Sequence, residues 1–254
     1  MYFDKEFEIF KKFISSNYDI DNELIKTKYV HTLSVVKVMM MLSRELNFNE
    51  EDSKLAFHLA LFHDLGRFRE VERQSVFNNL KFDHGAYSNK ILFNDGFINN
   101  FDINEDDYLL IKKAIYFHNK KDLPNSLIGK ERLFAELLRD ADRIDIYRAL
   151  SSQTNYKAIF DNVSSEKILN AFYNGDSIDI KDLKSRGDRV ILRLGFIKLF
   201  SFKESCKVLK ETGYLNEYLN IIKVNEESHE LFNNIINDIN RVLEGEKVYV
   251  REKI

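Results

Sequence analysis

The chain contains very few residues that interrupt helices. Its 254 residues include one proline and nine glycines, whereas a sandwich or barrel of many short strands needs such residues at most of its turns. Apolar residues recur at steps of three and four along most of the sequence, which is the period of an amphipathic helix. Hydrophobic residues make up 44% of the chain, enough for a buried core. The sequence therefore predicts an all-α fold.

The expected helices fall into two regions. We expect a compact helical core over residues 1–150 and a C-terminal helical extension over 151–254 that packs on it, because apolar density falls over 151–163. Residues 70–83 show no clean period and are expected to form a loop or broken helix. The helices are expected near residues 3–14, 22–45, 50–66, 84–93, 104–117, 131–150, 164–173, 188–200, 203–211 and 226–243. Asp21, Asn49 and Asn104 are the expected N-caps of the second, third and fifth of these.

The charge balance and the cysteine content exclude several classes of protein. Lys and Arg total 38 and Asp and Glu total 41, so the net charge is only −3. This balance argues against a chain that grips nucleic acid non-specifically, which usually has a basic excess. Cys206 is the single cysteine, which rules out a disulfide framework and a cysteine-based zinc site. Its surroundings, FKESCKVLK, contain nothing that would activate it as a nucleophile.

We expect neither a membrane span nor a signal peptide in this sequence. The most apolar run, Val35 to Leu42, is interrupted by Lys37 and is far shorter than the ~20 residues that span a bilayer. The first ten residues, MYFDKEFEIF, are acidic and amphipathic and lack the layout of a signal peptide. We therefore expect a soluble, cytoplasmic protein that does not act at a membrane.

Three short segments carry residues that can bind a metal. His63 and Asp64 are adjacent in LALFHDLGRF, and neighbours on an ideal helix point about 100° apart. Both can reach one ion only where the helix ends, and Gly66 is expected to supply that end. His31 shares an apolar helix face with Val35, Val38 and Leu42, and Asp142 in LLRDADRIDIY faces the core side. Imidazole and carboxylate donors without a thiolate suit Mn²⁺, Fe²⁺, Ni²⁺ or Zn²⁺.

The order His31, then His63-Asp64, then Asp142 in an Ala-Asp-Arg-Ile-Asp context resembles the HD-domain superfamily of metal-dependent phosphohydrolases. The resemblance covers roughly residues 22–150. It implies a compact all-helical core in which these four residues ligate one metal ion. The C-terminal hundred residues lie outside the motifs of the family.

Two further histidines match the members of this family that bind two metals. His84 in DHGAYSNKIL and His118 in AIYFHNKKDLP occupy positions that hold a second ion, with Asp64 bridging the pair. The resemblance thus implies one or two divalent ions per chain, of Mn, Fe, Ni, Zn or Mg. The sequence departs from the pattern in having Asn119 after His118, where such members often have paired histidines. It also lacks the GYP signature of the branch that degrades cyclic dinucleotides.

Each candidate ligand also has a purely structural interpretation. An isolated histidine on an apolar helix face, such as His31, is usually a core residue, and a buried carboxylate is usually part of an ion pair. Asp140 competes with Asp142, and the match to the family favours Asp142. His58 points about 140° away from the face of the HD motif and is expected to be structural. His229 is expected to be exposed.

Basic residues beside the expected ligands could hold a phosphate group. Arg67 follows the HD motif directly and Lys120 follows the last histidine, so each could hold non-bridging oxygens next to the central ligand Asp64. Lys121 and Arg143 are expected to be solvated residues at loop ends. The sequence contains no glycine-rich phosphate loop and no cysteine–histidine nucleophile pair.

These observations predict a hydrolase of phosphate esters or anhydrides, acting on a nucleotide-like small molecule through a metal-activated water. One alternative on the same scaffold is a di-iron oxygenase. Another is a non-catalytic module that senses a nucleotide, although a complete ligand set argues against it. The C-terminal helices could form a homodimer contact or a lid. The mixed charges of residues 184–189 give no support to binding of nucleic acid.

Overall fold

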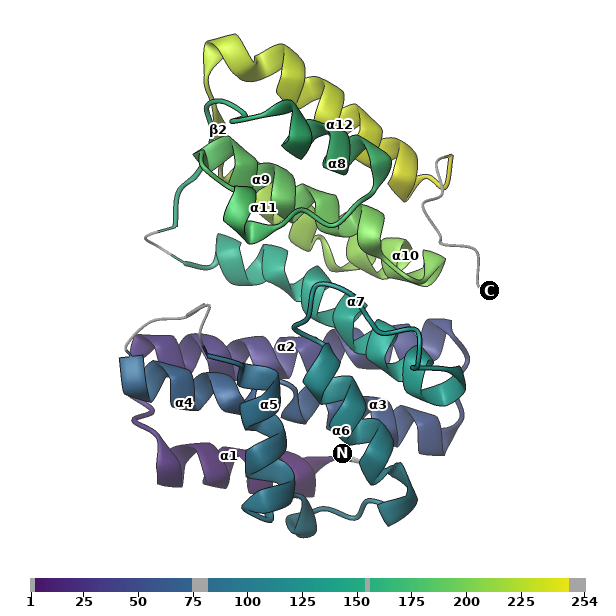
Figure 1. The fold of residues 1–254 in the computed structure, drawn as a ribbon. Coiled ribbons are helices and arrows are strands. Elements are labelled where there is room, and N and C mark those ends of the chain that lie inside the picture. The colour runs from purple at the N-terminus through teal and green to yellow at the C-terminus, as the bar shows by residue number, and fades with distance from the viewer. Residues whose placement is uncertain (1–2, 75–81, 154–155, 247–254) are drawn as a thin grey trace. The chain divides into compact units, whose positions relative to one another are not determined.

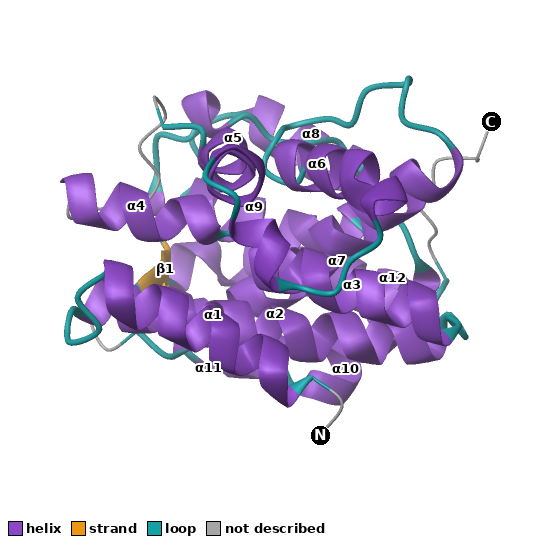
Figure 2. Cartoon of the chain, turned by 90° about the horizontal axis from the view of Figure 1, so that it is seen from below, coloured by secondary structure: helices purple, strands orange, loops and turns teal. Residues whose placement is uncertain are grey.

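The structure of the protein is a computed structural model that describes residues 3–74, 82–153 and 156–246. Within these ranges the only strands are β1 (Ala158–Phe160) and β2 (Ile222–Val224), and helices account for most of the remainder, as Figures 1 and 2 show. The predicted all-α fold is confirmed. The chain divides into two compact units, Met1–Arg139 and Asp140–Ile254.

The first unit contains the helices that carry most of the candidate ligands. They are α1 (Asp4–Asn17), α2 (Glu23–Glu45), α3 (Glu50–Phe62), α4 (Leu65–Gln74), α5 (His84–Asn89) with a π-helical turn (Lys90–Asn94), 3₁₀ turns at Phe97–Asn100 and Glu105–Asp107, and α6 (Tyr108–Phe117). The long helix α7 (Gly129–Ser151) begins in this unit and runs unbroken into the second. Because the division falls inside α7, the predicted extension over residues 151–254 stays a prediction.

The second unit contains the rest of α7 and the shorter C-terminal helices. These are α8 (Glu166–Asn174), a 3₁₀ turn at Ile180–Asp182, α9 (Arg186–Gly195) with a 3₁₀ turn at Phe196–Leu199, α10 (Lys203–Thr212), α11 (Tyr214–Asn220), a 3₁₀ turn at Glu226–Ser228 and α12 (His229–Leu243). The strands pair in parallel, with Ala158 opposite Ile222. The sequence analysis did not anticipate α11 or the strands.

Asparagine side chains begin three of the helical segments in the first unit. Asn49 accepts a hydrogen bond from the Asp52 amide at 2.8 Å, and Asn104 also caps its helix as predicted. The prediction for the second helix was wrong by one residue, because Asn22 caps α2 rather than Asp21. The Asp21 amide instead donates to the Asp19 side chain in the preceding turn.

Helix α4 extends further than its sequence pattern suggested. Of the expected loop or broken helix over 70–83, residues 70–74 are helical, so the loop is wrong for them, whereas 75–81 lie outside the described residues. Phe68 and Val71 are buried on one face of the helix. The fully buried carboxylate of Glu70 accepts a hydrogen bond from Arg67 one turn earlier, at 2.7 Å. This ion pair allows an acidic residue to lie on the buried face of α4. The helical period of apolar residues is therefore hard to recognise in this part of the sequence.

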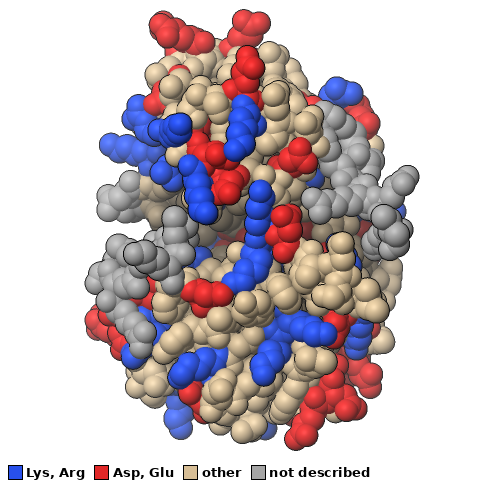
Figure 3. All heavy atoms as spheres, in the orientation of Figure 1, with Lys and Arg blue, Asp and Glu red and all other residues tan. Residues whose placement is uncertain are grey.

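Charged side chains of both signs are intermixed on the face of the molecule that Figure 3 shows. This distribution agrees with the net charge of −3. Among the helices that the structure describes, none is both long enough and apolar enough to cross a lipid bilayer.

Helices α3 and α4 are separated by a two-residue break at His63 and Asp64. The side chain of Ser88, from α5, bridges the break: its hydroxyl donates to the His63 carbonyl and accepts from the Gly66 amide, both at 2.8 Å. Buried backbone groups at helix ends need such partners because the helix itself does not satisfy them. The expected end of the helix at the HD motif is therefore present, and α5 holds it in place.

Gly66 has a different role from the one expected. It is the second residue of α4 rather than the end of α3. A Cβ atom at Gly66 would lie only 2.3 Å from the carbonyl oxygen of His84. The missing side chain therefore allows the backbones of α4 and α5 to approach closely, which brings His84 towards the HD motif.

Gly66→Ala should destabilise the first unit by about 1–3 kcal/mol, the usual range for overpacking of a tight contact. The added methyl group would push α5 away and break the bridge made by Ser88. Thermal or urea unfolding of the purified variant measures the effect. Gly195→Ala is the matched control, because its Cβ would meet only the Phe172 ring at an ordinary 3.7 Å. Equal stability of the two variants would contradict the proposed close approach.

His58 is a buried histidine outside the metal motifs, as expected. Its ring stacks on Phe62, with centroids 5.7 Å apart, and meets Phe101 edge-on. Burial lowers the pKa of His58 to about 4, from an ordinary value of 6.5. The neutral ring is therefore part of the apolar core of the first unit.

Protonation of His58 should contribute to acid unfolding. Its pKa is lower in the folded chain, so the unfolded chain binds this proton more tightly, and stability present above pH 6.5 is lost as the pH falls towards 4. Between pH 7 and pH 5 the loss should be about 2 kcal/mol. His58→Gln should remove this part of the pH dependence in urea unfolding, whereas replacement of the exposed His229 by Gln should leave it unchanged.

Candidate metal centre

The carboxylate of Asp64 lies between two pairs of imidazoles. Its Oδ2 atom is 3.5 Å from Nε2 of His31 and 3.6 Å from Nε2 of His63. Its Oδ1 atom is 3.7 Å from Nε2 of His84 and 3.6 Å from Nε2 of His118. All five side chains are buried. One carboxylate thus presents a separate oxygen to each histidine pair.

These separations fit donor atoms that share an ion. They are longer than a hydrogen bond between nitrogen and oxygen. Two donors about 2.1 Å from one ion lie about 3.0 Å apart at right angles and about 3.4 Å apart in a tetrahedron. The spacing in the structure is a few tenths of an ångström wider, so small rotations of the side chains would close it. The donor set of imidazole and carboxylate groups suits a first-row divalent metal.

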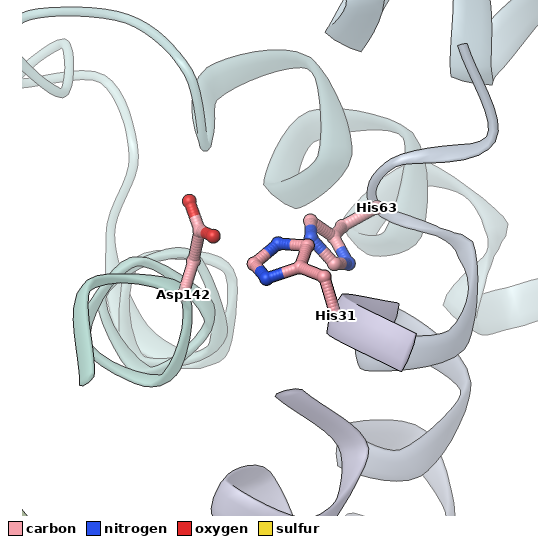
Figure 4. A group of neighbouring side chains, drawn as sticks. All are labelled: His31, His63 and Asp142. Carbon is pink, nitrogen blue, oxygen red and sulfur yellow. The ribbon is translucent and has the colours of Figure 1, made fainter. Parts of the chain in front are cut away.

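Asp142 joins the first pair of histidines. One donor atom each from His31, His63 and Asp142 lie within 4.8 Å of one another, and Figure 4 shows the three side chains projecting towards one another. Asp64, His84 and His118 form a second group by the same measure. The structure therefore brings together all six residues that the sequence predicts as ligands, in the two predicted sets. Their role as ligands stays a prediction.

Backbone carbonyls fix the proton positions on two of the histidines. Nδ1 of His63 lies 2.7 Å from the Ala60 carbonyl oxygen, and Nδ1 of His118 lies 2.6 Å from that of Ile115. A carbonyl only accepts, so each Nδ1 carries the proton and each neutral ring keeps a lone pair on Nε2. This is the tautomer that a metal ligand needs, and the second hydrogen bond orients the ring.

The electrostatic surroundings keep Asp64 ionised. Burial alone raises the pKa of this carboxyl group, but the charge of Lys28 and the neighbouring imidazoles His63, His118 and His84 outweigh burial and hold the pKa well below its usual value. Burial and the Arg67 guanidinium lower the pKa of His84 well below its ordinary value. The site therefore combines an ionised carboxylate with a neutral imidazole, the protonation states in which these groups bind metals.

Lys28 is the residue that the sequence analysis missed. Its ammonium group donates a hydrogen bond to Oδ2 of Asp64 at 2.8 Å, and its side chain is only 16% exposed. It precedes His31 by three residues on α2, so the two side chains share a face of the helix. The sequence did contain a signal for this role: Lys28 lies one turn before the candidate ligand His31, on a helix face that is otherwise apolar.

The other basic residues have distinct positions. Nε of Arg67 lies 3.9 Å from Oδ1 of Asp64, and its guanidinium is held by Glu70. Lys120 forms an ion pair with Asp83, the residue before His84. Lys121 is exposed, as expected. Arg67 is thus beside the central carboxylate, whereas Lys120 is engaged at the start of α5.

Arg143 differs from the expectation that it is a solvated residue at a loop end. It lies within α7 and donates to the Leu199 carbonyl at 2.7 Å. The expectation for Arg143 was therefore wrong, because a neighbouring segment of the second unit supplies it with an acceptor.

Asp140 has a structural environment in the second unit. Its fully buried carboxylate accepts hydrogen bonds from the Ser201 amide and the Ser205 hydroxyl, at 2.8 and 2.7 Å. Burial raises the pKa of Asp140 to about 6. Burial also raises the pKa of the Cys206 thiol to about 11, which agrees with the expectation that this cysteine is not an activated nucleophile. Asp142, rather than Asp140, joins the histidine pair.

Arg139 ties the end of α6 to α7. Its guanidinium donates to the carbonyl oxygens of Phe117, Lys120 and Lys121, at 3.1, 2.5 and 2.9 Å. These carbonyls lie at and just beyond the end of α6, where carbonyl groups have no acceptor role in a continuing helix. The segment around His118 is therefore held by a side chain two residues before the Ala-Asp-Arg-Ile-Asp motif.

Comparison with protein families agrees with this geometry. The family model for the HD domain matches residues 29–149, a range that contains all six candidate ligands. Searches among curated proteins and solved structures returned no match to the chain. The matched range, together with the paired histidines around Asp64, places residues 29–149 of the chain in the HD-domain superfamily.

Proposed function

We propose that the protein is a metal-dependent phosphohydrolase that cleaves a phosphate ester or anhydride of a nucleotide-like small molecule. The observation that carries this proposal is the position of the Asp64 carboxylate, with one oxygen facing His31 and His63 and the other facing His84 and His118. This arrangement supports one or two divalent cations joined by a single carboxylate. The HD-domain match supports hydrolase chemistry of this type at the level of the superfamily.

The chain's own residues would hold the cations and the substrate. A bound divalent cation supplies Lewis-acid polarisation of a phosphoryl oxygen and lowers the pKa of a water molecule. His31, His63 and Asp142 would hold one cation with Asp64, and His84 and His118 the other. All of these except Asp142 are buried, which limits the access of bulk water and strengthens the electrostatic interactions within the site.

Two cationic side chains beside Asp64 favour an anionic substrate. Lys28 touches one oxygen of this carboxylate and Arg67 approaches the other. The Nε atom of Arg67 is buried and has no hydrogen-bond partner among the described residues, so it has a free donor for a phosphate oxygen. A phosphate ester would gain from both charges as negative charge develops during transfer. A neutral substrate for an oxygenase would not need them.

The nucleotide-like class of the substrate is part of the proposal, and so is the role of Lys120 in binding it. Lys120, which the sequence analysis placed on the phosphate, lies further out and is paired with Asp83. We propose that it contacts the substrate at the entrance of the site rather than the transferred phosphoryl group. A cation there would attract the second phosphate of a nucleotide, at a strength that falls with added salt.

Asp64→Asn should abolish hydrolysis while the protein stays folded. The amide can still accept a hydrogen bond from Lys28, so the fold need not change, but the charge that joins the cations is lost. We would measure the activity as turnover of a panel of nucleotides and phosphate esters with Mn²⁺ in the absence of oxygen. Circular dichroism would show whether the helical content is unchanged. Asp95→Asn is the control, because Asp95 forms an exposed ion pair with Lys90.

Retention of metal-dependent hydrolysis by Asp64→Asn would contradict the proposal. Turnover that requires dioxygen in the wild type would contradict it as well, in favour of the oxygenase. Removal of metal with a chelator should abolish activity, and addition of Mn²⁺ should restore it.

Lys28→Met should have opposite effects on metal and substrate. Removal of a positive charge 2.8 Å from Asp64 should lower the Kd for Mn²⁺ by about tenfold or more, equivalent to about 1.4 kcal/mol. The same change should raise KM for a phosphorylated substrate because one of the two phosphate-binding charges is gone. Calorimetry and steady-state kinetics measure the two effects. Lys37→Met, on an exposed face of the same helix, should change neither.

A further inference from the structure

A chain of hydrogen bonds runs through the second histidine pair. The Asn119 amide nitrogen lies 3.2 Å from Oδ1 of Asp83 and 3.3 Å from Nδ1 of His84. Nε2 of His84 lies 3.2 Å from Nε2 of His118, and Nδ1 of His118 bonds to the Ile115 carbonyl. The chain thus connects a carboxylate at one end with a backbone carbonyl at the other.

The two ends of this chain determine where its protons lie. The Ile115 carbonyl only accepts, so His118 carries its proton on Nδ1 and has a lone pair on Nε2. The 3.2 Å contact between the two Nε2 atoms is a hydrogen bond when Nε2 of His84 carries the proton. Nδ1 of His84 must in turn accept, and the amide group of Asn119 donates to it.

Asp83 fixes the direction of the Asn119 amide. A carboxylate only accepts hydrogen bonds, so the group of Asn119 that contacts Asp83 must be its amide nitrogen. The same nitrogen faces His84. Lys120 and the Ala86 amide hold the Asp83 carboxylate in place. The amide oxygen of Asn119 is buried without a hydrogen-bond partner in the described part of the chain. It packs against Gly85, where a Cβ would lie 3.1 Å from it.

This proton arrangement opposes binding of a cation by His84. A metal needs the lone pair of Nε2, and with Nδ1 accepting from Asn119 the neutral ring carries its proton on Nε2. Coordination would require the proton to lie on Nδ1 instead, where a carboxylate or carbonyl usually accepts it. Rotation of the Asn119 amide would present its oxygen to Nδ1, but would also turn that oxygen towards Asp83.

We propose that Asn119 is a positioning residue that holds His84 in the tautomer unable to coordinate, and so makes the second cation bind more weakly than the first. Asp83 is its partner in this role. The inference rests on the proposed pair of cation sites but makes no use of the reaction. It concerns hydrogen bonds within this chain, so the affinity for Mn²⁺, measured without a substrate, tests it.

Two variants separate this role from simple electrostatics. Asn119→Asp supplies an acceptor for Nδ1 of His84 and adds a negative charge, so both accounts predict tighter binding of the second cation. Asp83→Asn removes a negative charge near the site, so electrostatics alone predicts weaker binding. In our proposal Asp83→Asn strengthens binding, because the new amide nitrogen, in the place of Oδ1, can donate to a rotated Asn119 oxygen, although it then no longer accepts from the Ala86 amide.

Titration calorimetry with Mn²⁺ on the metal-free full-length protein measures both affinities. The wild type should bind one ion tightly and a second weakly, and each variant should tighten the second by about 10- to 100-fold, the usual effect of a residue that hydrogen-bonds to a ligand. Binding of the first ion should not change. Weaker second binding in Asp83→Asn would overturn the proposal, and so would an unchanged affinity in both variants.

The tautomer of His84 gives an independent readout. Long-range ¹H–¹⁵N spectra of the metal-free protein, assigned with His84→Gln, should show the proton on Nε2 in the wild type and on Nδ1 in Asn119→Asp. A proton on Nδ1 in the wild type would overturn the proposal. A wild type that binds no Mn²⁺ at all would instead contradict the proposed function, so the two failures are distinguishable.

Discussion

The buried carboxylate of Asp64 is the interaction around which the first unit is arranged. An ionised group can stay buried only where opposite charge or hydrogen-bond donors compensate for its lost hydration. Lys28 provides that compensation directly, and Arg67 approaches from the other side. Four imidazoles complete the surroundings. Helices α2, α4 and α5 and the residues that follow α3 and α6 therefore direct polar side chains to one point inside an otherwise apolar core. This arrangement requires close backbone packing around it.

That packing depends on short contacts between backbones. Gly66 allows α5 to approach α4, and Gly85 allows α5 to approach the end of α6, where a Cβ would lie 2.8 Å from the Ile115 carbonyl. Ser88 then joins the two sides of the break between α3 and α4. The small helix α5 thus contributes one candidate ligand, His84, while its Ser88 contacts the backbone of His63 and its Gly85 packs against the end of α6 before His118.

Much of the fold and the candidate ligand set could be predicted from the sequence, for identifiable physical reasons. The period of the apolar residues indicates helices directly. The order and context of His31, His63-Asp64 and Asp142 indicate the HD motif. The cap of α2 was misplaced because Asp21 and Asn22 have equivalent capping chemistry, and only the preceding turn decides between them. Lys28 was missed because its role depends on a carboxylate 36 residues away. Similarly, the extent of α4 depends on the pairing of Glu70 with Arg67.

The three hydrogen bonds from Arg139 to the carbonyls after α6 have a mechanical consequence. A planar guanidinium with several donors fixes both the distance and the orientation of the groups that it joins. The rotation of α7 about its own axis is thereby coupled to the path of the chain that follows His118. A shift of the segment after His118 relative to Arg139 requires these hydrogen bonds to break, so the position of His118 is tied to the helix that carries this guanidinium.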